Sequence, residues 1–130
     1  MIVRDGAIGV TAVVPKEYDG SNVVSMIIVS TIDEYNSDFL CYVLNSYVGK
    51  IQFDLTRIGS ALSHTSVFSV SNIEIPKPCI DEQNEIVKQL KKQHEKLDSL
   101  IAEKESLIKD LESYKKSLIY EVVTGKRRVV

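Results

Sequence analysis

The sequence predicts an α+β protein, in which a small mixed α/β domain is followed by one long helix. Three observations support this fold class. β-Branched runs between turn residues fill the first thirty positions and are typical of strands. Residues 81–123 contain neither proline nor glycine, and their apolar residues recur at steps of three and four. Pro76 and Pro78 separate the two regions. We therefore expect a domain over residues 1–78, a coiled-coil helix over 79–125 and a basic tail over 126–130.

Composition limits the class of protein. The chain has 130 residues and a net charge of −2, whereas a stand-alone nucleic-acid binder usually carries a basic excess. Any contact with DNA must then be local, weak or shared with a partner. The two cysteines have no metal-ligand spacing, so we expect buried thiols, no metal and no cofactor. No apolar stretch reaches the ~18 residues of a membrane span, and we expect a cytoplasmic protein.

The N-terminal strands are expected over residues 8–14 (IGVTAVV) and 23–30 (VVSMIIVS). Ile2 and Val3 would form the end of a third strand, because Asp5-Gly6 is a turn pair. The chain thus begins inside a sheet, from which we expect either a fragment or a truncated reading frame.

The middle of the chain predicts one helix and a polar loop. A helix over residues 38–50 would be capped by Asn36 or Ser37, with Gly49 ending or bending it. Residues 56–66 are hydroxyl-rich and form the expected loop. Residues 67–70 and 73–75 are either short strands or one helical turn, and the prolines then stop the sheet.

The long helix has matching signals at its two ends. Asp81, Glu82 and Glu85 place negative charge in its first turns, where the helix dipole favours it. Gly125 is the expected C-cap. About 43 residues at ~1.5 Å each would give a rod of ~65 Å, which is too long for one small domain to cover.

A heptad pattern defines the apolar seam of this helix. The seam is expected at the a and d positions between Ile86 and Leu118, and its polar positions there are Gln93 and Lys104. Additional apolar residues at e positions widen the stripe, which indicates that the helix also rests on its own domain or on a second protein. The predicted seam consists of Ile86, Leu90, Leu97, Leu100, Leu107, Leu111, Tyr114 and Leu118.

The polar seam positions favour an antiparallel homodimer. A parallel pair would bring Lys104 against its own copy, which is unfavourable in a dry seam. An antiparallel pair crossing near Ala102 instead sets Leu100 opposite Lys104, whose charge can extend outwards. A helix that folds back on its own domain, or that pairs with a different protein, remains the alternative.

Four segments together resemble the C-terminal part of the DNA specificity subunit of type I restriction–modification systems. The third resembles the family's Ile-Pro-x-Pro-x-x-x-Glu-Gln signature and is followed by an Ile-Val pair. The resemblance covers nearly the whole chain. Its segments are residues 4–9 (RDGAIG), 39–46 (FLCYVLNS), 75–83 (IPKPCIDEQ), and 113–119 with 121–126 (SYKKSLI, EVVTGK).

The resemblance implies a target-recognition domain that reads half of a split site in double-stranded DNA. It also implies a conserved spacer helix on which methyltransferase subunits dock. Complete members carry two such domains and two antiparallel helices, whereas this chain has one helix and the latter part of one domain. Homodimerisation would restore the two-helix spacer.

DNA contacts would need donors for base edges and phosphates. The loop over residues 56–66 supplies most candidates, with two cations from the N-terminal region. A solvated polar loop is the alternative interpretation. The basic tail could similarly contact DNA or a partner, or simply end the helix. The expected DNA-binding residues are Arg4, Lys16, Arg57, Ser60, His64 and Thr65.

An enzymatic function is not indicated by the sequence. No Gly-x-Ser-x-Gly elbow surrounds a serine, and Gly6-Ala7-Ile8-Gly9 lacks the third glycine of a dinucleotide fingerprint. We expect no catalytic residue; methyl transfer and cleavage would belong to partner subunits. The sequence therefore favours a DNA-recognition component, with a dimerisation module that does not bind DNA as the alternative.

Overall fold

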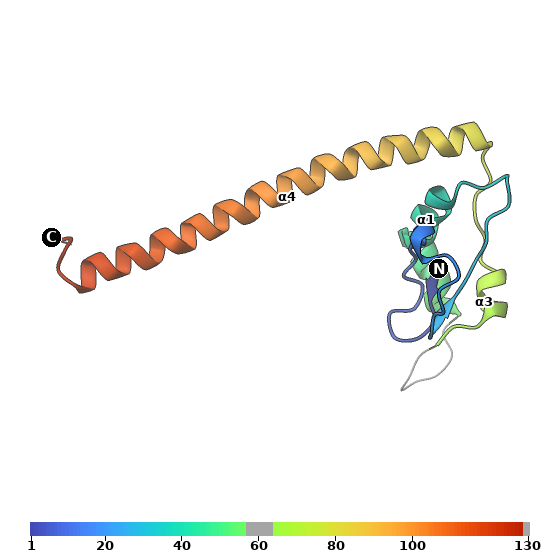
Figure 1. The fold of residues 1–130 in the computed structure, drawn as a ribbon, viewed down its shortest axis with the longest axis horizontal. Coiled ribbons are helices and arrows are strands. Elements are labelled where there is room, and N and C mark those ends of the chain that lie inside the picture. Colours follow the sequence, from blue (N-terminus) through green and yellow to red (C-terminus); the bar gives the residue numbers. More distant parts are fainter. Residues whose placement is uncertain (57–63, 129–130) are drawn as a thin grey trace. The chain divides into compact units, whose positions relative to one another are not determined.

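The computed structural model describes residues 1–56 and 64–128, which divide into two compact units, Met1–Lys88 and Gln89–Val130. The ribbon in Figure 1 follows the elements in chain order. The fold is mixed, with a two-stranded sheet, several short helices and one long helix. The elements are β1 (Ile2–Val3), the 3-10 helix η1 (Lys16–Tyr18), β2 (Met26–Ile27), α1 (Ser37–Asn45), α2 (Tyr47–Leu55), α3 (Val67–Ser71) and α4 (Ile80–Val123).

The sheet is smaller than the sequence predicts. β1 and β2 pair antiparallel with Ile2 opposite Ile27, and on its other side Ile2 forms a single bridge with Thr11. The strand predicted over residues 8–14 is wrong because the chain turns sharply at Gly9, whose φ is +84°. The strand predicted over 23–30 shortens to two residues, since Ser25 at φ 60° breaks the extended backbone before it.

Two helices replace the single helix predicted over residues 38–50. Asn36 caps α1 as expected, with its side chain accepting bonds from the backbone N–H groups of Asp38 and Phe39. Ser46 is extended and caps α2 through Gly49 N–H at 3.3 Å. A Cβ at Gly49 would lie 2.3 Å from the carbonyl oxygen of Leu44. Gly49 therefore permits the sharp corner between two helices rather than ending one.

The core of the first unit gathers the sheet and these two helices. Its buried residues are all apolar, and residues from α3 and the following segment pack against them. Burial of such side chains is the main favourable contribution to folding. The core consists of Ile2, Ile8, Ile27, Leu44 and Phe53.

The segment before the long helix contains one short helix and no strand. Residues 67–71 form α3, capped by the Ser66 side chain, which resolves the alternatives for that segment. Residues 73–75 belong to no helix or strand and have no partner strand among the described residues. The side chain of Gln52 takes the place of that strand: it donates to Glu74 C=O at 2.9 Å and accepts from Glu74 N–H at 2.8 Å.

The long helix is confirmed, with α4 spanning Ile80–Val123. Gly125 has a φ of +72° and donates to the Val122 carbonyl, so the expected C-cap is also confirmed. The first turns of α4 belong to the first compact unit, which ends at Lys88. Cys79, expected to be buried, is exposed, while Cys41 is half-buried.

Candidate functional site

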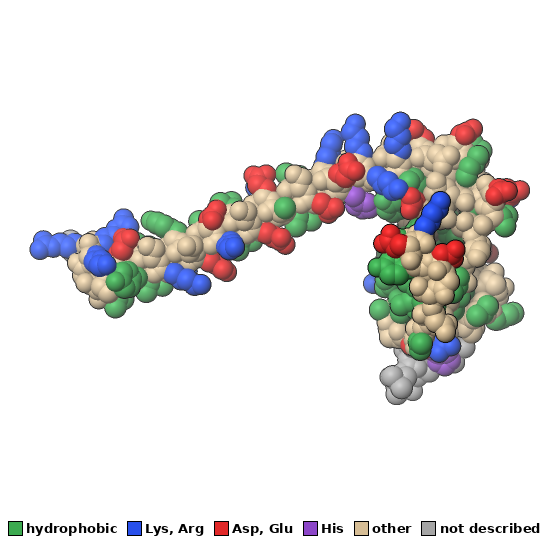
Figure 2. Space-filling view, viewed as in Figure 1, with side chains coloured by type: hydrophobic (Ala, Val, Ile, Leu, Met, Phe, Trp, Pro, Cys, Tyr) green, Lys and Arg blue, Asp and Glu red, His purple; other side chains and the backbone are tan. Residues whose placement is uncertain are grey.

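The most extensive candidate surface is the apolar seam of α4. Within the described chain, the central seam side chains lie half open to solvent, with Leu97 54% and Leu107 50% exposed. Figure 2 shows hydrophobic side chains at the surface along this helix, between acidic and basic ones. Heptad spacing places these residues on one face. Six of the eight predicted seam residues are exposed and two, Ile86 and Leu118, are half-buried; the exposed ones are Leu90, Leu97, Leu100, Leu107, Leu111 and Tyr114.

Three of the four apolar e positions show two kinds of environment, while the fourth, Val122, is half-buried in the last turn of α4. Val87 is 6% exposed and packs within the first unit. Ile101 and Ile108, farther along α4, are 54% and 58% exposed. The widened stripe thus rests on the chain's own domain only at the start of α4, and its middle keeps an apolar edge open to solvent.

Gln83 fixes the start of α4 to the first unit. Its side chain is fully buried and makes three hydrogen bonds with backbone groups. Nε2 donates to the carbonyl oxygens of Glu34 and Pro78, each at 2.9 Å, and Oε1 accepts from Asn36 N–H at 2.9 Å. Since Asn36 caps α1, one side chain links the first turn of α4 to the start of α1.

Sequence reasoning did not find this role for Gln83. A signal was available, because Gln83 occupies an a position of the heptad, where a polar residue breaks the apolar seam. It is also the glutamine of the Ile-Pro-x-Pro-x-x-x-Glu-Gln segment. Lys77 and Glu34 form an ion pair beside this contact, which raises the pKa of Lys77 above its ordinary value of 10.5.

A second candidate surface brings together residues far apart in the sequence. We call it the Arg4–His64 corner, formed by Arg4, Asp5, Ser25 and His64. Asp5 forms a β-bridge with His64, and Arg4 N–H donates to Ser25 C=O at 2.9 Å. Two of the six predicted DNA-binding residues therefore meet at one edge of the sheet.

The charges at this corner partly offset one another. Arg4 lies 3.2 Å from the Asp5 carboxylate. A hydrogen bond from Ser25 is the main cause that lowers the pKa of Asp5 from 3.8, and Arg4 and His64 lower it further. The corner thus holds an ionised carboxylate beside its cation, which reduces the attraction of Arg4 for phosphate.

The remaining predicted DNA contacts lie apart or are covered. Lys16 begins η1 and is exposed, while Arg57 and Ser60 lie outside the described residues. Thr65 is only 1% exposed, so its side chain cannot reach a ligand in this fold, and its prediction as a DNA contact is corrected. Its backbone N–H donates to Arg4 C=O at 3.1 Å, which explains the burial: Thr65 joins the sheet edge.

The basic tail turns back on the end of α4. Lys126 lies 4.6 Å from the centre of the Tyr120 ring, and Arg127 lies 4.0 Å from the Glu121 carboxylate. Positive charge at a helix C-terminus is favoured by the helix dipole. These contacts support the interpretation of Lys126 and Arg127 as a helix end.

Comparisons with known proteins identify no relative: no family model, curated protein or solved structure matches this chain. Within the described ranges, no group of three or more histidine, cysteine, aspartate or glutamate side chains is arranged to hold a metal ion. Of the described helices, α4 included, none is long and apolar enough to cross a bilayer.

Proposed function

We propose that this chain is a non-catalytic DNA-recognition component of a type I restriction–modification system. In this proposal the first unit contributes to reading double-stranded DNA, and α4 docks methyltransferase subunits. The observation that carries the proposal is the exposed apolar seam of α4, because a long half-exposed stripe of this kind is typical of a partner-binding helix. The four segments that resemble the restriction–modification family also support the assignment. One of them, residues 75–83, ends in Gln83, which is the residue that anchors α4 to the first unit.

DNA binding is tested by gel shift with a methyltransferase subunit of the same system present. We expect sequence-dependent binding that weakens as salt rises, because phosphate contacts release counterions. Arg57→Ala should weaken binding at low salt, whereas Lys92→Ala, a change on the exposed face of α4, should not. Equal affinity of Arg57→Ala and the parent would remove Arg57 as a contact, and the absence of any sequence-dependent shift would contradict DNA recognition.

We further propose that two copies pair through α4 in antiparallel orientation. In the register set by the heptad, Leu90 of one copy lies beside Tyr114 of the other. Two Leu90 positions would then be 24 residues apart along the axis, or about 36 Å at ~1.5 Å per residue. A parallel pair would instead place the two Leu90 side chains together.

Cross-linking distinguishes these orientations. In a chain with Cys41 and Cys79 replaced by serine, Leu90→Cys mixed with Tyr114→Cys should give a cross-linked heterodimer under oxidising conditions. Leu90→Cys alone should stay uncross-linked and serves as the matched control. A cross-linked Leu90→Cys homodimer would refute the antiparallel pair, and a monomeric mass for the parent protein would refute self-pairing altogether.

The register is tested by two acidic substitutions in the seam. Leu100→Glu would face Lys104 of the other copy and gain an ion pair, whereas Leu107→Glu would face the apolar Leu97. We expect Leu107→Glu to weaken the dimer by ~2 kcal/mol or more, since an unpaired charge enters an apolar contact. Leu100→Glu should weaken it clearly less. Equal losses in sedimentation equilibrium would contradict this register.

A dimerisation module without DNA binding is the second candidate function. The pairing of Arg4 with Asp5 and of Arg127 with Glu121 favours it, because both arginines already have anionic partners. Under this alternative the cross-linking and register results stay as described. The gel shift then distinguishes the two functions, since no DNA sequence should be bound with the methyltransferase subunit present.

A further inference from the structure

A turn of the first unit covers one side of the start of α4. We call residues 32–35 the 32–35 turn. Gln83, at an a position of the heptad, donates from Nε2 to the carbonyl oxygen of Glu34 in this turn at 2.9 Å. Asn84, at the next b position, accepts from Asn36 Nδ2 at 2.7 Å. The 32–35 turn therefore lies on the side of α4 that carries its a, e and b positions, where Val87 is also buried.

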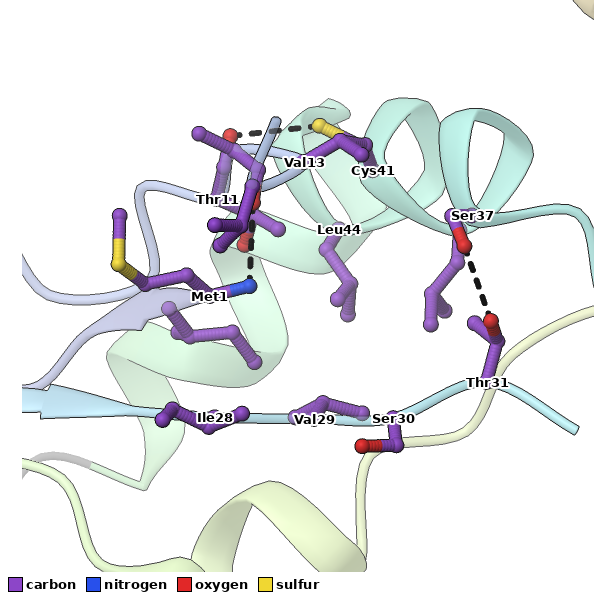
Figure 3. A pocket seen from close by; sticks show the side chains of 14 residues that line it. Met1, Thr11, Val13, Ile28, Val29, Ser30, Thr31, Ser37, Cys41 and Leu44 are labelled. Atoms are coloured by element: carbon purple, nitrogen blue, oxygen red, sulfur yellow. Dashed lines mark hydrogen bonds between the residues drawn. The ribbon is translucent and has the colours of Figure 1, made fainter. Parts of the chain in front are cut away.

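The 32–35 turn is held in place by hydrogen bonds at both ends. Tyr35 N–H donates to Ile32 C=O at 2.9 Å. The hydroxyl oxygens of Thr31 and Ser37 lie 2.9 Å apart, and Figure 3 shows this bond as a dashed line at the start of α1. A turn that is already ordered loses little conformational entropy when it binds a partner.

This turn presents one apolar and two acidic side chains to solvent. Ile32 is 64% exposed, and Asp33 and Glu34 are exposed as well. Glu34 forms the ion pair with Lys77, so Asp33 is the carboxylate that we test below.

The end of α4 has the complementary composition. The b position borders the e position around a helix, and every b position from Asn84 to Glu112 is polar. Ile119 is the first apolar b residue and is 53% exposed, and Val123, at the next f position, is 79% exposed. The apolar stripe thus widens away from the seam in the last turns of α4.

Cations follow directly after this apolar widening. Lys126, Arg127 and Arg128 are all exposed. Arg127 already lies near Glu121, so Arg128 is the cation that we test. Their charge is opposite to that of the 32–35 turn.

The proposed antiparallel pair brings these two surfaces together. When Leu90 of one copy lies beside Tyr114 of the other, Ile86 lies beside Leu118. Residues 119–123 then run along residues 81–85 of the other copy. The e positions of both helices lie on the same side of an antiparallel pair. The widened end of α4 therefore approaches the side on which the 32–35 turn covers the other helix.

We propose that the end of α4 in one copy docks on the 32–35 turn of a second copy. Ile119 and Val123 contact Ile32, and the basic tail lies beside Asp33. The occupant is a second copy, because apolar and charged groups both match in the register that the seam sets. Two such contacts form, since the pair is symmetric. This inference rests on the proposed antiparallel pairing but does not depend on DNA recognition.

The apolar part of the contact is tested by sedimentation equilibrium. Ile32→Glu and Val123→Glu should each raise the dimer Kd roughly tenfold, because each change enters both ends of the pair. Ile28→Glu is the matched control: Ile28 is also 64% exposed but directly follows β2, and the Kd should change by no more than about twofold. Parent-like Kd values for Ile32→Glu and Val123→Glu would overturn the docking.

A charge swap tests the ionic part without depending on how well each variant folds. Arg128→Asp alone and Asp33→Arg alone each bring like charges together at both ends of the pair. A mixed dimer of the two variants restores opposite charges at both ends. At low salt, mixed dimers should outnumber homodimers by about tenfold in native mass spectrometry. Arg128→Asp mixed with Asp19→Arg, the same change at another exposed aspartate of the first unit, should give only the statistical mixture.

The seam cross-link separates failure of this inference from failure of the pairing. Preferred mixed dimers together with a Leu90→Cys to Tyr114→Cys cross-link support the docking. The same cross-link with only statistical mixing overturns the docking and leaves the antiparallel pair standing. Preferred mixed dimers with a cross-linked Leu90→Cys homodimer would mean that like ends meet, which overturns both.

Discussion

Replacement of Gln83 by leucine should strongly destabilise the first unit, although the two side chains are similar in size. Gln83 is fully buried and satisfies three backbone groups: Asn36 N–H, Glu34 C=O and Pro78 C=O. Leucine would leave all three without their partner. A buried polar group that loses its partner costs ~1–3 kcal/mol.

The expected loss in the free energy of unfolding is about 3 kcal/mol, taking the low end for each group because water can reach some of them. That is a large part of the ~5–15 kcal/mol that stabilises a typical domain. Asn84→Ala is the matched control. It removes one exposed hydrogen bond of 2.7 Å from the same turn of α4, and should change stability by no more than ~0.5 kcal/mol.

Amide hydrogen exchange is the assay, because the helical signal in circular dichroism is dominated by α4. The slowest amides of α2, around Phe53, report unfolding of the first unit. The backbone N–H of Asn36 donates to the Gln83 side chain. It should lose its protection against hydrogen exchange in Gln83→Leu and keep that protection in Asn84→Ala. A Gln83→Leu protein as stable as Asn84→Ala would refute the role of Gln83 as the anchor of α4.

Three further predictions concern the first unit. Gly9→Ala should lower the free energy of unfolding by more than ~3 kcal/mol, because the new Cβ would lie 2.4 Å from the buried Phe53 ring at a φ of +84°. The control is Gly6→Ala, where φ is +79° and no atom lies within 4 Å of the new Cβ. Thermal unfolding should show a loss of only ~1–2 kcal/mol for this control. Asn36→Ala should lower stability by ~1 kcal/mol through loss of the α1 cap, and an unchanged melting temperature would contradict this. The pKa of Asp5 is lowered by folding, so its stabilising contribution is present above pH 3.8 and is lost as pH falls through its folded value. Asp5→Asn should flatten the pH dependence of stability in that acidic range, and parallel parent and variant curves would refute it.

Local sequence signals were sufficient to predict a helix where its apolar residues follow one helical period and where residues typical of helix ends mark its two termini. α4 fits this description, since 3.6-residue periodicity, early acidic residues and Gly125 all agree. The cap at Asn36 belongs to the same class, because its partners are two and three residues away. The antiparallel seam is a prediction from the same periodicity, and awaits the cross-linking described above.

Strands were predicted less well because a strand needs a partner that the sequence does not specify. Residues 8–14 have the composition of a strand, yet the turn at Gly9 leaves only residues 10–12 bonded to the start of the chain, with a single bridge at Thr11. Residues 73–75 also have strand-like composition, and there Gln52 replaces the missing strand by bonding both backbone groups of Glu74. Such substitutions depend on side chains brought together over long separations.

By itself the sequence determined that a long amphipathic helix exists, where it ends and which residues form its apolar stripe, because helical hydrogen bonds and heptad spacing are local. Only the tertiary structure decided which groups are buried and which distant side chains meet. It covered Thr65 at the sheet edge, set Asp5 beside Ser25 and His64, and used Gln83 to anchor α4. These outcomes depend on contacts between distant segments, which composition and periodicity do not encode.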